Sequence, residues 1–433
     1  MIKEEKVFFS PVPLWEDPSS VLKSGKLGLL CNQTAWHPET GEYIFETLYR
    51  RGVLKRVFTP EHGLFGELQD QVKLEGKELY GDLAFNGCEF VSLYGSDESS
   101  LSAEAEKLSD LDALVVDLQD VGVRYYTYLS TLRNLFITLK NGNIPLPIWV
   151  IDRENPAGPS VEGTPLEKGF ASFVGIEGIP HRYGLTIGEM AGYFHAELEA
   201  DFPLHIAAFN AGQKTGVGQR LFPWAVPPSP NIPGFFTCDF YSGQCLWEGT
   251  NVSEGRGTTR PFEVFGAPWM ESLLTYNKKA GYDSWNESGH PLFVKSNLNR
   301  STLNQGAALR WHRFIPTFHK YKDECCFGFQ LIRREAFAYH ALLHALRLIR
   351  FVKDNCEGFS FRPGKYEKGN EKTAIELLAG DVTILSYLRG EGPKEKDLLE
   401  LFKKEEEKWI AKASGFRFYE EPLKSAASQI SPA

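Results

Sequence analysis

Short apolar runs alternate with amphipathic stretches through the first half of the chain. The runs that predict strands lie at residues 26–31, 54–58, 89–94, 113–117, 147–151 and 204–209. Between them, the periodicity predicts helices at residues 44–51, 102–108, 130–141 and 186–199. Thr186 and Glu189 have the spacing of a capping box, which marks a helix start. This alternation is typical of an α/β fold with a Rossmann-like, doubly wound, mostly parallel sheet.

The second half of the chain has a different pattern. Residues 222–233 contain five prolines, which excludes regular structure and places a domain junction near this segment. We therefore expect two domains, over residues 1–220 and 221–433. The smaller C-terminal domain should be α+β. Its predicted elements are a strand at 327–332 and helices at 337–352, 374–388 and 394–414, followed by a disordered tail at 425–433.

Composition excludes several classes of protein. A net charge of −9 over 433 residues argues against a nucleic-acid partner, because phosphates would be repelled. No stretch of about 18 apolar residues is present, so we expect no membrane span. Residues 1–13 do not have the pattern of a signal peptide, which favours a cytoplasmic location. Seven cysteines without a CxxC pair indicate buried free thiols, as expected in a reducing compartment.

Polar side chains gather where three of the predicted strands end. Glu61 and His62 follow the second strand, Asp120 follows the fourth, and Asp152 and Arg153 follow the fifth. Ligands of open parallel sheets bind outside the carboxyl ends of the strands, so these side chains should share one cleft. We interpret the chain as an enzyme.

Glu61 is the most specific of these candidates. A glutamate between a proline and His-Gly is poorly placed for a core and too early for a helix cap. We expect a catalytic acid or base here; the alternative is a carboxylate that holds a neighbouring loop. His62 could orient Glu61, contact a substrate or serve only the structure.

The segment after the fourth strand combines charges with aromatic rings. Asp120 and Arg124 stand beside Tyr125 and Tyr126, and flat rings next to hydrogen-bonding groups suit sugars. Tyr128 is expected in the core. Arg124 could pair with Asp120 or bind an anionic group of the ligand.

Further polar residues are candidates for the same cleft. Glu162 and His181 are flanked by turn formers, and the glycine-rich segment 249–257 could fold over the sheet. The residues expected to bind substrate are Asn32, His62, Arg124, Tyr125, Tyr126, Asp152, Arg153, His181, Asn251, Glu254 and Arg256.

No cofactor is expected. The first strand leads into Cys-Asn-Gln-Thr at residues 31–34 instead of a glycine-rich turn, so NAD or FAD is not predicted. We also assign no metal, although a site made from His62, Asp152 and His181 stays open as an alternative.

Seven segments in order carry a resemblance to a known family. They lie at residues 29–34, 59–63, 117–128, 152–156, 183–189, 228–231 and 248–258, and include Thr-Pro-Glu-His-Gly and Glu-Gly-Thr-Asn-Val-Ser-Glu-Gly-Arg-Gly-Thr. Together they resemble the NamZ-type exo-β-N-acetylmuramidases, formerly a bacterial domain of unknown function. The sequence departs from the family pattern at Glu154, where proline is expected, and at Tyr183, where histidine is common.

The resemblance implies a Rossmann-like catalytic domain, a C-terminal domain that closes the active-site cleft, and release of terminal N-acetylmuramic acid from the non-reducing end of peptidoglycan fragments. Glu61 would be the catalytic residue. For a second carboxylate we rank Asp120 and Glu162 first, then Asp152 and Glu254; alternatively, the substrate's own 2-acetamido group attacks.

An arginine should bind the lactyl carboxylate of muramic acid, and Arg124, Arg153 and Arg256 are the candidates. Two other classes of function stay open: a non-catalytic glycan-binding protein and a metal-dependent hydrolase. The partner is a peptidoglycan-derived saccharide, and the oligomeric state is not predicted.

Overall fold

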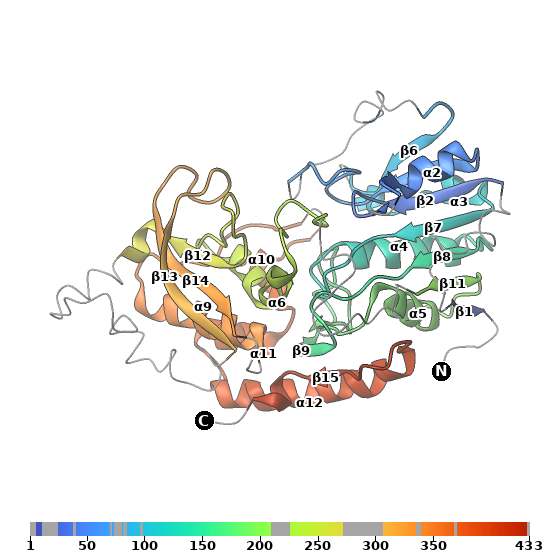
Figure 1. Cartoon of the computed structure of the whole chain (residues 1–433). Coiled ribbons are helices and arrows are strands. Elements are labelled where there is room, and N and C mark those ends of the chain that lie inside the picture. The colour runs from blue at the N-terminus through green and yellow to red at the C-terminus, as the bar shows by residue number, and fades with distance from the viewer. Residues whose placement is uncertain are drawn as a thin grey trace.

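The protein folds into two lobes that lie side by side (Figure 1). The structure is a computed structural model, and it describes residues 6–10, 25–37, 40–69, 72, 80, 85–95, 98–208, 226–271, 306–334, 339–367 and 370–430. The N-terminal lobe is built on residues up to 208 and the C-terminal lobe on residues 235–389. The expected domain boundary at 220/221 lies outside the described residues.

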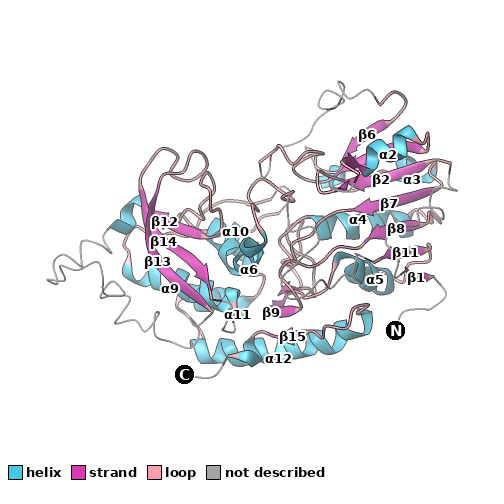
Figure 2. Ribbon diagram, viewed as in Figure 1, coloured by secondary structure: helices cyan, strands magenta, loops and turns pink. Residues whose placement is uncertain are grey.

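A seven-stranded sheet forms the N-terminal lobe (Figure 2). Its strands are β1 (Val7–Ser10), β2 (Leu27–Cys31), β5 (Leu54–Thr59), β6 (Glu89–Ser92), β7 (Ala113–Asp117), β8 (Ile148–Ile151) and β11 (Leu204–Ala207). They lie in the order β1-β11-β8-β7-β2-β5-β6, and every pairing is parallel. All six predicted strands are confirmed. The seventh, β1, was not predicted.

The strand order fixes where a ligand can bind. The chain runs outward from β2 through β5 to β6 and then returns to β7 on the other side of β2. Neighbouring connections diverge at such a switch point and leave a crevice at the carboxyl ends of the strands. Residues that follow β5, β6 and β7 line the cavity found at this edge of the sheet.

Helices cover both faces of the sheet because each strand alternates its side chains. Leu30 of β2 packs on the same face as α3 (Ala105–Ser109), α4 (Tyr128–Asn141) and α5 (Ile187–Glu197). Leu29 packs on the opposite face with α2 (Ile44–Arg50). The predicted start of α5 is confirmed, because the Thr186 hydroxyl accepts from the Glu189 amide at 3.1 Å and the Glu189 carboxylate accepts from the Thr186 amide at 2.9 Å.

The C-terminal lobe is α+β, as predicted. An antiparallel sheet contains β12 (Val264–Ala267), β14 (Cys326–Arg333) and β13 (Ala307–Phe314) in that order. Its helices are α6 (Phe235–Gln244), α9 (Ala341–Asn355), α10 (Ala374–Ala379) and α11 (Val382–Arg389), with short 3-10 turns at Cys245–Gly249 and Pro268–Glu271. Helices α6 and α9 pack against each other.

One predicted helix in this lobe is two helices. The pattern predicted a continuous helix at 374–388, but Gly380, at φ +60°, ends α10 and Asp381 caps α11. The Asp381 carboxylate accepts from the amides of Thr383 and Ile384 at 2.7 and 3.0 Å. The left-handed glycine breaks the helix although the apolar period continues across it.

The segment after α11 joins the lobes. Helix α12 (Glu395–Ala413) lies across the base of both lobes in Figure 1. Strand β15 (Lys424–Ser425) then pairs in parallel with β9 (Ser160–Pro165), which also pairs with β10 (Pro180–Arg182). The tail predicted to be disordered is therefore ordered to Ile430, where a short 3-10 turn (Ala427–Gln429) ends. The buried Glu406 carboxylate of α12 holds it, accepting from Ser425 at 2.6 Å and from the Ala427 amide at 2.9 Å.

Candidate active site

A cavity of about 740 Å³ lies between the two lobes. Such a volume is within the range of small-molecule sites. The N-terminal lobe contributes Glu61, His62, Tyr94, Tyr125, Tyr126 and Phe173 to the lining. The C-terminal lobe contributes Tyr241, Glu248, Arg256, Phe262, Tyr366 and Glu367.

Glu61 enters this cavity from the end of β5. After Pro60 the chain turns sharply through His62 and Gly63, which both have positive φ (74° and 84°). The Glu61 side chain is 6% exposed, and the Thr127 hydroxyl donates to its Oε2 at 2.7 Å. The turn therefore points a buried, oriented carboxyl group at the space between the lobes. His62 also lines the cavity, and its Nδ1 lies 2.9 Å from the carbonyl of Leu68.

Two of the predicted tyrosines form part of the wall. Tyr125 and Tyr126 line the cavity, and the Tyr125 hydroxyl donates to the Ser242 carbonyl in the C-terminal lobe at 2.8 Å. Burial raises the pKa of both phenols well above the ordinary value, so both keep their protons at neutral pH. Tyr128 is fully buried, as expected for a core residue.

Charged side chains of the C-terminal lobe form the opposite wall. Arg256 donates to Glu248 Oε1 at 2.8 Å, and the Tyr366 hydroxyl donates to Glu248 Oε2 at 2.5 Å. Arg256 also lies 3.4 Å from Glu254 and 5.0 Å from the centre of the Phe262 ring. Glu248 and Arg256 are buried, so this wall is fixed in place.

Glu367 connects this wall to the N-terminal lobe. Its carboxylate accepts from the amides of Phe173 and Val174 at 3.2 and 3.0 Å. Burial raises the pKa of Glu367 above its ordinary value, and the negative charge of Glu61 adds to the rise. Glu61 and Glu367 come from different lobes, line the same cavity and are close enough to interact electrostatically.

Asp120 lies behind the wall, outside the residues that line the cavity. Its Oδ2 accepts from the Gly122 amide at 2.7 Å and from the Tyr183 hydroxyl. Burial raises the pKa of Asp120 to about 6. Its contacts are those of a group that shapes the loop after β7.

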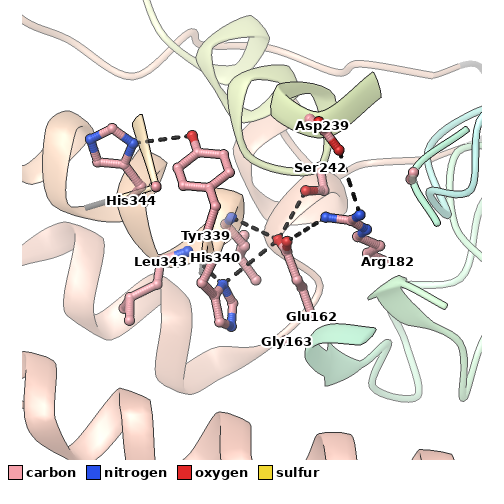
Figure 3. A network of polar contacts seen from close by, with 12 residues as sticks. Glu162, Gly163, Arg182, Asp239, Ser242, Tyr339, His340, Leu343 and His344 are labelled. Atoms are coloured by element: carbon pink, nitrogen blue, oxygen red, sulfur yellow. Dashed lines mark hydrogen bonds and ion pairs between the residues drawn. The ribbon is translucent and has the colours of Figure 1, made fainter. Parts of the chain in front are cut away.

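Glu162 also lies outside the cavity, in a buried polar network (Figure 3). It accepts from Arg182 at 2.9 Å, from the Ser242 hydroxyl at 2.9 Å and from the Leu342 amide at 3.0 Å, and His340 is 3.6 Å away. Burial opposes its ionisation, yet His340 and Arg182 bring the pKa of Glu162 below the ordinary value. The network ties β9 to both α6 and α9.

Arg124 is completely buried and does not reach the cavity. Its guanidinium donates to the carbonyls of Leu378 and Ala379 at 3.0 and 2.8 Å, at the end of α10. Its Nη2 also lies 3.0 Å from Nε2 of His181, and burial lowers the pKa of His181 well below its ordinary value. Gly380 is required beside it, because a Cβ there would lie 2.7 Å from Arg124.

The pair after β8 holds loops together. Asp152 accepts from Thr186 at 2.8 Å, from the Gly188 amide at 2.7 Å and from Tyr419 at 2.7 Å, and burial raises its pKa to about 7. Arg153 pairs with Asp117 at 2.6 Å. Neither residue lines the cavity.

The remaining candidates also bind other parts of the protein. Asn32 donates to the Tyr128 hydroxyl at 2.7 Å, and Asn251 donates to the Gly358 carbonyl at 2.7 Å. Glu254 pairs with Lys320 at 2.9 Å and His319 at 3.1 Å; burial opposes its ionisation, but these cations lower its pKa. Of the fourteen predicted site residues, the cavity lining contains Glu61, His62, Tyr125, Tyr126 and Arg256.

Sequence reasoning missed Glu248, Tyr366 and Glu367. Glu248 stands at the start of the glycine-rich motif that was recognised, so that motif pointed to it. Tyr366 and Glu367 lie in an irregular segment without a motif. Their position depends on how the lobes dock.

Within the described residues, no group of three or more His, Cys, Asp or Glu side chains is arranged to hold a metal ion, and His62, Asp152 and His181 form no such group. The cysteines are free thiols and most are buried, as predicted. No described helix is long and apolar enough to cross a bilayer.

Comparisons with known proteins agree with this architecture. The N-terminal and C-terminal family models of the exo-β-N-acetylmuramidase NamZ match residues 27–235 and 240–419. A protein of Bacillus subtilis (strain 168) described as peptidoglycan β-N-acetylmuramidase NamZ is 33% identical over 378 residues, which are 84% of this chain and 82% of that protein.

Crystal structures of two DUF1343-family proteins of Bacteroides fragilis NCTC 9343 have the same fold, with TM-scores of 0.71 and 0.65. Each is 23% identical, and the alignments cover 94% of this chain and 97% of theirs. Because the family models match both lobes in order and the Bacillus protein is similar over most of its length, the chain belongs to the NamZ exo-β-N-acetylmuramidase family.

Proposed function

We propose that the chain hydrolyses the glycosidic bond of a terminal N-acetylmuramic acid and releases this sugar from the non-reducing end of peptidoglycan fragments. Membership of the NamZ family supports the reaction and the class of substrate. The observation that carries the proposal is the position of Glu61, a buried and oriented carboxyl group in a cavity between two lobes.

The lining of the cavity fits an enzyme that acts on chain ends. Glu248, Arg256 and Phe262 are almost inaccessible to solvent, and we call these three residues the buried end of the cavity. Ala171 and Glu177 are exposed and belong to the open end. This combination of buried and exposed lining residues supports a site that takes the terminal sugar and leaves the rest of the substrate outside.

Glu61 is the proton donor in the proposed mechanism. Its proton moves to the glycosidic oxygen, the bond between that oxygen and the anomeric carbon breaks, and the remaining saccharide leaves with a new hydroxyl group. The Thr127 hydroxyl, at 2.7 Å, fixes the orientation of the carboxyl group during this step. Water finally adds to the anomeric carbon and gives one proton to a carboxylate of the cavity, and exchange with solvent returns a proton to Glu61.

Glu367 is the second carboxyl group that we propose, in place of Asp120, Glu162, Asp152 and Glu254. It lines the same cavity and is close enough to Glu61 for their charges to interact. Both of its oxygens already accept backbone hydrogen bonds, which suits an acceptor for a water or for the substrate's acetamido N–H better than a nucleophile.

Arg256 is the proposed contact for the lactyl carboxylate. It is the one of the three candidate arginines that lines the cavity, whereas Arg124 and Arg153 are engaged elsewhere. A planar guanidinium can bind a carboxylate through two hydrogen bonds. The Tyr366 hydroxyl donates to Glu248 and so holds that carboxylate in place beside Arg256.

The test is hydrolysis of a chromogenic β-glycoside of N-acetylmuramic acid by the wild type and by Glu61→Gln. We expect turnover by the wild type and a loss of about 10²–10⁴-fold in the variant. A glycan-binding protein would give no turnover with either. Full activity after treatment with a chelator would separate this mechanism from that of a hydrolase with a removable metal.

A further inference from the structure

We propose that Tyr94 and Phe173 form a binding subsite for the sugar on the leaving side of the scissile bond, a neutral N-acetylated hexose. This inference deepens the proposed function and rests on it. We call this pair of residues the Tyr94–Phe173 platform.

The cavity lining includes one face of the start of α4. Thr127, Ser130, Arg133 and Asn134 all line the cavity, and their spacing places them on one face of the start of α4. At 1.5 Å per residue this face is roughly 10 Å long. This face begins at Thr127, which orients Glu61, and ends at Arg133 and Asn134, which are only partly buried. We infer that the cavity has room for a second sugar on the open side.

The two rings of the platform come from different loops at this open end. Tyr94 follows β6 and Phe173 lies in the connection between β9 and β10. Their ring centres are 5.8 Å apart, the planes are inclined by 37°, and both residues are half-buried and line the cavity. The C–H face of a pyranose packs on such rings while its hydroxyl groups remain hydrated.

Backbone hydrogen bonds fix the two loops that carry the platform. The Phe173 amide donates to Glu367, and the Tyr94 amide donates to the Ser92 hydroxyl at 3.1 Å. Beside it, Asn134 is fixed by a hydrogen bond of 3.1 Å to the Leu101 carbonyl. Loops that are fixed before the ligand arrives cost little conformational entropy on binding.

The chemistry of the two ends differs in the way that the substrate's two sugars differ. The buried end presents the Arg256 guanidinium, held by Glu248, and a guanidinium suits the sugar that carries a carboxylate. At the open end Glu177 is exposed to solvent and Arg133 is paired with Glu197 at 3.1 Å, so the platform and the Asn134 side chain are available to an uncharged N-acetylated sugar. The order of the ends therefore matches a terminal muramic acid followed by a glucosamine-type residue.

Substitutions of the platform test this proposal when two substrates are compared. The first is the disaccharide of N-acetylmuramic acid and N-acetylglucosamine; the second is the β-glycosyl fluoride of N-acetylmuramic acid, which has no leaving sugar. For Phe173→Leu and Tyr94→Leu we expect kcat/KM to fall about tenfold on the disaccharide, mostly through KM, and to stay unchanged on the fluoride. Phe173→Tyr keeps the flat face and should retain activity on both substrates.

The matched control is Phe8→Leu. Phe8 is also a partly exposed ring in an aromatic pair, with His205 at 4.8 Å, but it lies at the edge of the sheet outside the cavity lining. It should leave both substrates unaffected. The proposed subsite would be contradicted if Phe173→Leu and Tyr94→Leu lost equal kcat/KM on the two substrates, or lost none on the disaccharide. Absence of hydrolysis of either substrate by the wild type would instead contradict the proposed function.

Discussion

Glu61 and Glu162 are both buried glutamates on the N-terminal lobe, and the sequence presented both as catalytic candidates. Glu162 is surrounded by Arg182, Ser242, His340 and a backbone amide and has no access to the cavity. Glu61 lines the cavity and is oriented by a neutral hydroxyl. Burial alone therefore does not distinguish the two glutamates, whereas access to the cavity does, and it supports Glu61 as the proposed catalytic residue.

Alanine substitutions should separate the two glutamates completely. Glu61→Ala should lose about 10³-fold in kcat with little change in thermal unfolding. Glu162→Ala leaves Arg182 without its buried partner and should lower the free energy of unfolding by about 3–5 kcal/mol. Residual kcat per folded molecule, measured below the unfolding transition, should stay near the wild-type value for Glu162→Ala. A loss of kcat equal to that of Glu61→Ala would refute the contrast.

Glu367→Gln should reduce kcat by about 10²-fold, because an amide cannot supply the negative charge of the second carboxylate. One amide oxygen can still accept a backbone hydrogen bond, so the connection to Phe173 and Val174 should be partly kept. NMR of the freshly released sugar would show whether the anomeric configuration is retained. If Glu248→Gln lowered kcat by about 10²-fold and Glu367→Gln left it unchanged, Glu248 and not Glu367 would be the second carboxylate.

Asp120→Asn should change how stability depends on pH. The folded state holds the Asp120 proton with a pKa of about 6, above the value of an unfolded chain, so the contribution of this group declines as pH rises from about 4 through about 6. In the wild type, this group lowers the free energy of unfolding between pH 5 and pH 8. In Asp120→Asn the decrease over the same interval should be smaller by roughly 1–3 kcal/mol. Urea titrations at the two pH values measure this difference, and identical pH profiles would exclude it.

Arg256→Lys should have the smallest effect and the most specific one. The lysine keeps a positive charge for Glu248 but cannot form two parallel hydrogen bonds to a carboxylate. We expect the preference for muramic acid over glucosamine glycosides to fall about tenfold, with activity on the glucosamine glycoside unchanged. Arg153→Lys, at an arginine that faces Asp117, is the control. Unchanged selectivity in Arg256→Lys would rule out this contact.

The sheet could be predicted because parallel strands buried on both faces leave continuous apolar runs. Strand β1 escaped prediction since its residues Phe8 and Phe9 are exposed, and the short strands β9 and β15 carry polar residues. The tail was mistaken for disorder because its small polar residues are fixed by a distant carboxylate, Glu406, and not by local pattern.

The site was predictable only in part for a related reason. The ends of the strands identify which loops border the crevice, and this was enough to predict that Glu61 lies there. They do not show which way each side chain points. Asp120 and Asp152 follow strands in the same manner and turn instead to backbone amides and hydroxyls. Glu367 follows no strand, and it reaches the cavity because the C-terminal lobe docks against residues 172–174.

The late segment formed by α12 and β15 has a consequence for how this protein is made. Strand β15 completes the small sheet that starts with β9, and the Trp409 indole of α12 donates to the Tyr183 carbonyl at 2.9 Å. The first lobe to leave the ribosome thus obtains its last strand from residues translated long afterwards. The two lobes mature together, and a gene cut between them would yield two unfinished halves.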